Sequence, residues 1–375
     1  MKTRLLSTAL QLALILLVAL LLTAASYSRT WLQVNTPGFG DPDNQYIMAV
    51  EPFDGSLYAS TNNSTTGAQL WRSTNGSDWS VVVSDGFGSL DNGSIEDLIE
   101  YQGYLYAGTS SDGGEIWRWK SGEVWAPVVQ DGADDLNNSN FFKMAVFSNT
   151  LYAATFNEVT GAGVYYSSDG ETWLQSNVDG FGSLNNGAIP AMTVFGDQLY
   201  VGTANGATGA EIWASNGITW TNVMTGGFGI SDNAAIASLA GFNGVLYALA
   251  RNTTTGLQLW YSSNGSSWDK VTAAGFIKLN NNRGYGLIKF RGQLYLITGN
   301  FATGSEVWRT PDGAAWEQVG FAGWGDPANG GSYWGNSMGI FQGRLFVGTI
   351  KTDSTGGEIW MYLPYTVSLP MLSKN

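Results

Sequence analysis

Few side chains of this sequence can do chemistry. The 375 residues include no Cys and no His. This excludes an imidazole base, a His-ligated metal, a thiol nucleophile and a disulfide. Catalysis would have to rely on carboxylates, and two that face each other across a sugar could hydrolyse a glycoside. Glu96 and Asp97 are the acids of greatest interest, but neighbours along a strand are expected to point to opposite faces, so they do not form such a pair.

Candidate ligand-binding residues are those that depart from an internal repeat of the chain, described below. They bring charge or an aromatic ring toward one entrance of the predicted ring: Glu96, Asp97, Lys143, Arg251, Arg283, Tyr285 and Trp334. The alternative interpretation is a solvated, charge-balanced channel mouth. Four other acids could bind Ca²⁺ together with neighbouring carbonyl groups: Asp41, Asp43, Asp134 and Asp135. No twelve-residue EF-hand loop accompanies them, so the sequence predicts no metal site and no cofactor.

The N-terminal segment has the pattern of an export signal. Lys2 and Arg4 precede an unbroken apolar run over residues 12–22, and Thr23-Ala-Ala25 offers small residues to a signal peptidase. The run is shorter than the ~20 residues of a membrane span. Residues 1–25 are therefore predicted to be a signal peptide, with an uncleaved signal anchor as the alternative. Either interpretation predicts a secreted or cell-surface protein, attached to a membrane only if the segment is uncleaved.

Charge limits the partners that can be expected. The formal net charge is −13, and only 13% of the residues are charged. An acidic exported chain repels phosphate backbones, so nucleic acid is not expected as a partner. An extracellular glycan or a protein surface remains, and the chain is expected to be a monomer.

The candidate residues are positioned by a repeat, which is the strongest signal in the sequence. A Trp recurs about every 47 residues, and these positions mark the predicted repeat starts: Trp31, Trp79, Trp125, Trp173, Trp220, Trp268 and Trp316. An Asn recurs in the following loop, at positions 44, 92, 138, 186, 233, 281 and 329. Each repeat also contains a Phe-ended or Tyr-ended apolar segment, a Leu-Tyr strand such as residues 103–109, and a Trp-ended strand such as residues 208–213.

Four short strands in each repeat predict a β-propeller. The expected fold is all-β, with seven blades of four antiparallel strands over residues 26–362 and a C-terminal tail over residues 363–375. The repeat begins in an outermost strand (residues 31–34) and ends after a third strand (residues 358–362). We therefore expect the N-terminal strand to complete the last blade and close the ring, since an open ring leaves exposed strand edges.

The turns before the recurring Trp resemble the Asp-box of sialidase-type (BNR) propellers, whose pattern is Ser-x-Asp-x-Gly-x-Thr-Trp. The copies here are one residue shorter, and several have Asn in place of Asp: residues 73–79, 167–173, 262–268 and 310–316. The spacing and the Gly-x-Leu-Tyr strand are also similar to kelch repeats. The resemblance covers residues 31–362 and implies a propeller architecture, not sialidase chemistry.

Sialidases resemble one another in an Arg triad, a Tyr–Glu nucleophile pair and an Asp acid. On the face opposite the Asp-box turns, only Arg251 and Arg283 are left for a triad, and the Phe/Tyr-Arg-Ile-Pro motif is missing. The sequence therefore favours an exported, non-catalytic binding module. A glycoside hydrolase or lyase is the alternative, and a passive structural domain of the cell surface is the second.

Overall fold

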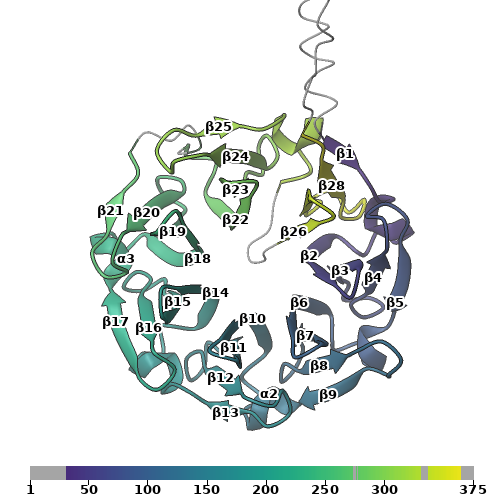
Figure 1. Cartoon of the computed structure of the whole chain (residues 1–375), viewed down its shortest axis with the longest axis horizontal. Coiled ribbons are helices and arrows are strands. Elements are labelled where there is room, and N and C mark those ends of the chain that lie inside the picture. Colours follow the sequence, from purple (N-terminus) through teal and green to yellow (C-terminus); the bar gives the residue numbers. More distant parts are fainter. Residues whose placement is uncertain (1–30, 273–275, 277, 331–336, 365–375) are drawn as a thin grey trace, which may run out of the picture.

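The computed structural model describes residues 31–272, 276, 278–330 and 337–364, apart from the side chains of residues 283–285. Its strands form successive antiparallel meanders, arranged around a central axis with one edge strand of each meander innermost (Figure 1). The predicted all-β fold is confirmed, and the arrangement is that of a β-propeller. Among the described residues, no helix is long and apolar enough to span a bilayer.

In every meander but the last, the two inner strands are the longest. The innermost strands are β2 (Tyr46–Phe53), β6 (Ser94–Tyr101), β10 (Asn140–Phe147), β14 (Ala188–Phe195), β18 (Asn233–Phe242), β22 (Arg283–Phe290) and β26 (Met338–Phe341). The second strands are β3 (Ser56–Asn62), β7 (Tyr104–Ser110), β11 (Thr150–Phe156), β15 (Gln198–Ala204), β19 (Val245–Asn252), β23 (Gln293–Gly299) and β27 (Arg344–Gly348). A two-residue turn joins the members of each pair, which places their connection at one end of the axis.

The two outer strands are short. The third strands are β4 (Leu70–Ser73), β8 (Ile116–Trp119), β12 (Val164–Ser167), β16 (Ile212–Ser215), β20 (Gln258–Ser262), β24 (Glu306–Thr310) and β28 (Ile359–Tyr362). The outermost strands are β5 (Ser80–Val83), β9 (Ala126–Val129), β13 (Leu174–Gln175), β17 (Trp220–Met224), β21 (Asp269–Lys270), β25 (Glu317–Gln318) and β1 (Trp31–Gln33). β1 pairs antiparallel with β28, with Trp31 opposite Tyr362, so strands from the two ends of the chain share one sheet.

Short helical turns connect an outermost strand to the next innermost one. They are η1 (Pro37–Gly40), η2 (Gly86–Gly88), α2 (Asp131–Asp134), η3 (Asp179–Gly182), α3 (Gly226–Gly229) and η4 (Ala322–Gly325). Most carry an aromatic residue at a positive φ, as at Phe181 (φ 54°), and its ring stacks on a third-strand Trp. The Phe181 and Trp213 ring centroids are 4.5 Å apart, and Phe181 also meets Trp220 edge-on.

The core lies between neighbouring meanders. Phe53 and Tyr58 of one meander pack against Ile95 and Leu98 of the next, and equivalent clusters recur around the ring. Neither face of a meander is buried without its neighbours, which is why a single repeat is not expected to fold alone.

A β-bulge interrupts most innermost strands near their start. In β6 the pairing with β7 shifts between Ile95 and Asp97, and the same shift occurs in β2, β10, β14, β18 and β22. A bulge sets two residues against one partner and breaks the alternation of side chains. The prediction that Glu96 and Asp97 point to opposite faces is therefore wrong: both carboxylates contact β10.

Candidate functional site

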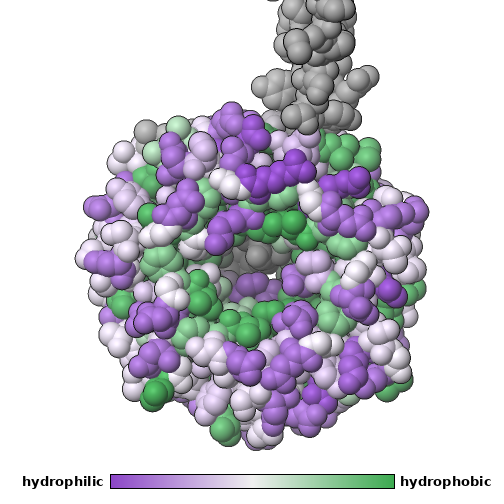
Figure 2. Space-filling view, viewed as in Figure 1, coloured by the Kyte–Doolittle hydropathy of each residue, from purple (hydrophilic) through white to green (hydrophobic). Residues whose placement is uncertain are grey.

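The long connections of the meanders lie together at one end of the axis. The connection entering β6 hydrogen-bonds to the one between β3 and β4, through Gly86 N–H to Ala68 O (3.0 Å) and Ala68 N–H to Asn92 O (2.8 Å). We call the surface formed by these connections the loop face, and the opposite surface, formed by the short hairpin turns, the turn face. A space-filling view shows a hollow at the centre of the molecule, surrounded by mixed polar and apolar side chains (Figure 2).

The recurring Asn fixes the connections of the loop face. Asn186 Nδ2 donates to Gly180 O and to Glu211 Oε2, each at 2.9 Å. Its Oδ1 accepts from Thr203 Oγ1 (3.1 Å) and Asn205 Nδ2 (3.0 Å). The equivalent residues Asn44, Asn92, Asn138, Asn233, Asn281 and Asn329 are buried in the same way. The repeated Asn that the sequence showed in a loop is thus a buried structural hub.

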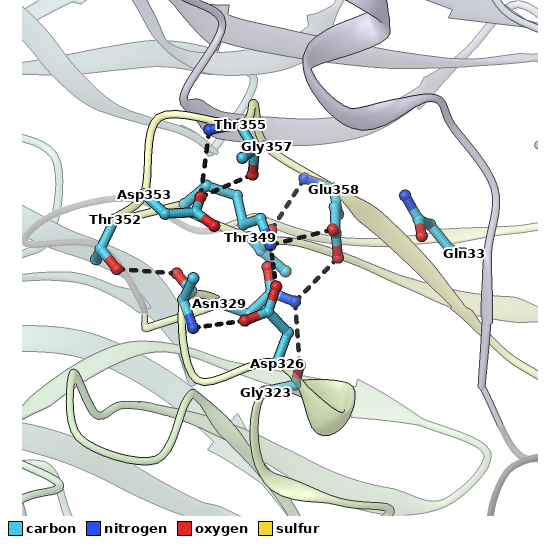
Figure 3. A network of polar contacts seen from close by, with 12 residues as sticks. Gln33, Gly323, Asp326, Asn329, Thr349, Thr352, Asp353, Thr355, Gly357 and Glu358 are labelled. Carbon is cyan, nitrogen blue, oxygen red and sulfur yellow. Dashed lines mark hydrogen bonds and ion pairs between the residues drawn. The ribbon is translucent and has the colours of Figure 1, made fainter. Parts of the chain in front are cut away.

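One repeat modifies this hub with a buried charge (Figure 3). Lys351 stands where other repeats place a second Asn, and it forms ion pairs with Asp326 and with Glu358 Oε1 (3.3 Å). Asn329 Nδ2 still donates to Glu358 Oε2 (2.9 Å), but the buried Asn329 Oδ1 has no hydrogen-bond partner among the described residues. The nearby Lys351 ammonium lowers the pKa of Asp326.

A continuous row of backbone-paired residues runs around the loop-face end of the inner strands. We call it the mouth row; each residue pairs with the next, within a meander or between two neighbours. In order, it is Ile350, Tyr46, Asn62, Ser94, Ser110, Asn140, Phe156, Ala188, Ala204, Ala235 and Arg251. Because backbone hydrogen bonds set its path, the row is rigid and differs from place to place only in its side chains.

Three of the predicted site residues meet at this end of the channel. Asp97 accepts from Lys143 Nζ (2.6 Å) and from Met144 N–H (2.8 Å), which belongs to the free edge of β10. Glu96 Oε1 accepts from Asn140 Nδ2 (3.1 Å). Glu96 and Asp97 are both buried. Their contacts join β6 to β10, and little of either side chain is accessible to a ligand.

Burial changes the ionisation of two channel carboxyl groups. It raises the pKa of Glu96 to about 7, against the lowering effect of its hydrogen bonds. It also raises the pKa of Glu51, on β2, to about 8, and the nearby Asp97 adds to that shift. Sequence reasoning missed Glu51, whose only signal was an acid in an otherwise apolar inner strand.

Arg251 lies apart from the other predicted residues whose side chains are described, at the last position of the mouth row. It lines a cavity of about 350 Å³ with Phe156, Glu158, Leu184 and Asn185, over a floor of Gly187, Ala188, Ala204, Gly206 and Ala234. Arg283 and Tyr285 belong to β22, but their side chains are outside the described residues, as is the whole of Trp334. Phe156 and Glu158 were missed by the sequence analysis, although the run of small residues opposite them was visible.

The four acids considered for Ca²⁺ do not gather. Asp41 accepts from Asp43 N–H (3.0 Å) and Asn63 Nδ2 (3.1 Å), and Asp135 accepts equivalently from Asn137 and Asn157. These carboxylates therefore shape their own loops. In the described part of the chain, no group of three or more acidic side chains could hold a metal ion.

Apolar side chains also recur on the loop face, two residues before each buried Asn. Leu90, Leu136, Leu184 and Leu279 are between 60% and 64% exposed there. We call these four, with the exposed Pro42 and Pro327 at the same position, the crown; Ser231 is the exception. Repeated exposure of a large apolar residue on a rigid loop is a feature of interaction surfaces.

Comparison with known proteins shows the fold alone. No protein-family model matches the chain, and no curated protein matches it. Among solved structures, a chain in the crystal structure of the mitotic checkpoint complex aligns with a TM-score of 0.58 at 11% identity, covering 90% of this chain and 95% of that one. The β-propeller domain of the trilobed protease from Pyrococcus furiosus aligns with a TM-score of 0.48 at 7% identity, covering 85% and 96%. The alignment with the mitotic checkpoint chain shows a shared fold, and the strand arrangement described above is that of a β-propeller.

Proposed function

We propose that the chain is an exported, non-catalytic β-propeller that binds another protein through its loop face. The observation that carries this proposal is the crown, which presents an apolar side chain at the same position of repeat after repeat. The hydrogen bonds of the buried Asn hold each of these loops in place. Binding would therefore cost little conformational entropy of the loops. A structural neighbour that is part of a protein complex is consistent with a protein partner.

The proposal includes seven blades over residues 26–362 and a ring closed by β1. The pairing of Trp31 with Tyr362 supports the closure, as does the hydrogen bond from Val34 N–H to Ile359 O (2.9 Å). The Asp-box-like character of the hairpin turns belongs to the same proposal. It is supported by Asp169, whose Oδ1 accepts from the N–H groups of Glu171 and Thr172 at 2.9 and 2.8 Å.

The channel carboxylates favour a structural role over catalysis. Asp97 is already paired with Lys143 and with a strand-edge N–H group, and Glu96 hydrogen-bonds to a neighbouring strand. A glycosidase needs two carboxyl groups across a substrate that both can reach. The second alternative, a passive structural domain of the cell surface, would require neither these acids nor the crown.

The test combines export with partner capture. The full chain is expressed in a secreting host, and the mass of the secreted form should show the loss of residues 1–25. A photo-crosslinking side chain placed beside the crown should then capture a protein. The crown variant Leu90→Ser/Leu136→Ser/Leu279→Ser should lose that capture.

The matched control is Val124→Ser/Ile218→Ser, which removes apolar side chains from the turn face that are even more exposed than the crown leucines. It should retain the captured protein. Equal capture by both variants would reject the loop face as the docking surface, and selective retention on immobilised glycans would instead indicate a lectin.

A further inference from the structure

We infer that the cavity beside Arg251 binds a short zwitterionic peptide of two or three residues, with its carboxylate at Arg251 and its ammonium at Glu158. This site goes beyond the proposed protein docking. It depends on none of the three crown leucines changed above.

The cavity exists because the mouth row becomes small along one arc. Phe156 is followed in the row by Ala188, Ala204 and Ala235, and Arg251 comes next. Elsewhere the row carries polar or larger side chains, from Ser94 and Ser110 to Asn62 and Tyr46. Ala188 and Ala204 line the cavity together with Ala234, the neighbour of Ala235, so a trough of small side chains separates the ring of Phe156 from the guanidinium of Arg251.

The floor of the trough is rigid. Two contacts between neighbouring meanders, Phe156 with Ala188 and Ala204 with Ala235, hold its two sides together. Asn205 N–H donates to Ala234 O at 2.7 Å, which fixes a further residue of the lining. A preformed trough of about 350 Å³ is at the small end of ligand sites in proteins and suits a small molecule or a chain terminus.

Opposite charges lie toward the two ends of the trough. Glu158 packs beside Gly187, because a Cβ at Gly187 would lie 3.2 Å from Glu158 Cγ. Gly187 precedes Ala188, which is three strand pairings from Arg251 in the mouth row. With 4.5–5.5 Å between paired Cα atoms, this separation is roughly 15 Å.

The separation determines the length of the ligand. A single amino acid is too short to reach both charges. Three extended residues cover about 10 Å, and the long side chains of Arg251 and Glu158 span the remainder. Because Phe156 and Leu184 line the Glu158 end, an apolar first residue is favoured.

Net charge selects a zwitterion over a simple ion. The chain carries a net charge of −13, so an anion approaching Arg251 would be repelled at long range. A neutral zwitterion avoids that repulsion and still pairs both charges. Arg is suited to the carboxylate because its planar guanidinium binds both oxygens at once.

The experiment is isothermal titration calorimetry of the full chain with the tripeptide Leu-Ala-Ala. N-acetylated and C-amidated Leu-Ala-Ala should each bind at least tenfold more weakly, and a six-residue peptide of the same type should also bind more weakly. Glu158→Gln should weaken binding of the free tripeptide at least tenfold but leave the N-acetylated peptide unchanged, because that peptide no longer has the ammonium group that Glu158 pairs with.

Two further variants test the location. Arg251→Gln should weaken binding at least tenfold, whereas the exposed turn-face control Arg291→Gln should leave it unchanged. Gly206→Leu should abolish binding by filling the cavity. No atom lies within 4 Å of a Cβ at Gly206, and its φ is not in the left-handed region, so the variant should fold normally.

Several results would overturn the inference. One is the absence of Leu-Ala-Ala binding at millimolar peptide, and another is equal binding of the capped peptides. Binding that survives in folded Gly206→Leu would place the peptide elsewhere. Binding of trigalacturonate that needs Arg251 but not Glu158 would identify an acidic-sugar site. None of these results bears on the crown experiment, so the two proposals can fail separately.

Discussion

At the scale of single residues, the recurring Asn contributes more than its place in a polar loop would indicate. Asn186 joins a helical turn, the end of a second strand and the residue before a third strand through four hydrogen bonds. Removing it leaves several buried groups without partners, and each such group costs ~1–3 kcal/mol.

We therefore expect Asn186→Ala to lower the free energy of unfolding by ~3 kcal/mol or more, measured by chemical denaturation. The adjacent Asn185, which is exposed, is the matched control, and Asn185→Ala should change stability by no more than ~0.5 kcal/mol. Similar losses from both substitutions would show that the hub is not the source of stability.

The buried carboxyl groups of the channel predict how stability depends on pH. The folded-state pKa of Glu96 is about 7, above its usual value of 4.5, so the folded chain holds a proton that the unfolded chain releases between those values. The stabilisation is complete below pH 4.5 and is lost as the pH rises through 7; Glu51 extends the loss to about pH 8.

The melting temperature should accordingly rise when the pH is lowered from 8 to 5. Glu96→Gln should remove part of this dependence, at most ~3 kcal/mol between these limits. The exposed Glu123→Gln is the control and should keep the full dependence. A melting temperature that does not change over this range would contradict the raised pKa of both groups.

At the scale of elements, the hairpin turns next to the outermost strands are positioned by a neighbouring meander. Gly170 has a φ of +74°, and a Cβ there would lie 1.8 Å from the hydroxyl oxygen of Tyr106. Gly265 and Gly313 meet Tyr200 and Tyr247 in the same way. At these three turns, the tyrosine of one meander's second strand therefore requires a Gly in the turn of the next meander.

Substitutions at two glycines distinguish the stability lost through backbone strain from the stability lost through side-chain packing. Gly122→Ala, at φ +87° with open space around it, should cost only the ~1–2 kcal/mol of a left-handed non-Gly residue. Gly170→Ala should cost a further ~1–3 kcal/mol because Tyr106 must move. Thermal unfolding of both variants gives the comparison, and equal costs would mean that the tyrosine contact adds nothing.

At the scale of the whole molecule, the proposed closure depends on an N-terminal strand only three residues long. Trp31 supplies most of its contacts: its ring is buried, lies 5.6 Å from that of Trp324, and donates from Nε1 to Val319 O at 3.1 Å. Leu32 beside it faces solvent. The closure would therefore depend on packing by one side chain in addition to backbone pairing.

We expect Trp31→Ala to destabilise the chain by ~3–5 kcal/mol, as for other buried aromatic residues. Leu32→Ala, in the same strand, should have an effect within ~0.5 kcal/mol. Deletion of residues 26–36 should be at least as damaging as Trp31→Ala, measured by the shift in melting temperature. A deletion that leaves the melting temperature unchanged would reject the closure.

The sequence by itself determined the all-β architecture and the order of the strands, because the recurring Trp, the Asn-Gly and Asp-Gly turns and the apolar segments are local signals. It also identified Glu96, Asp97, Lys143 and Arg251 as departures from the repeat. The residues that each of these side chains contacts were decided by packing between repeats, which the sequence does not show. The bulge at Ile95 and Asp97 turned two adjacent acids toward one strand, and nothing local in the sequence indicates a bulge. The cavity at Arg251 likewise depends on alanines from different strands lying in one row, and only the tertiary structure brings them together.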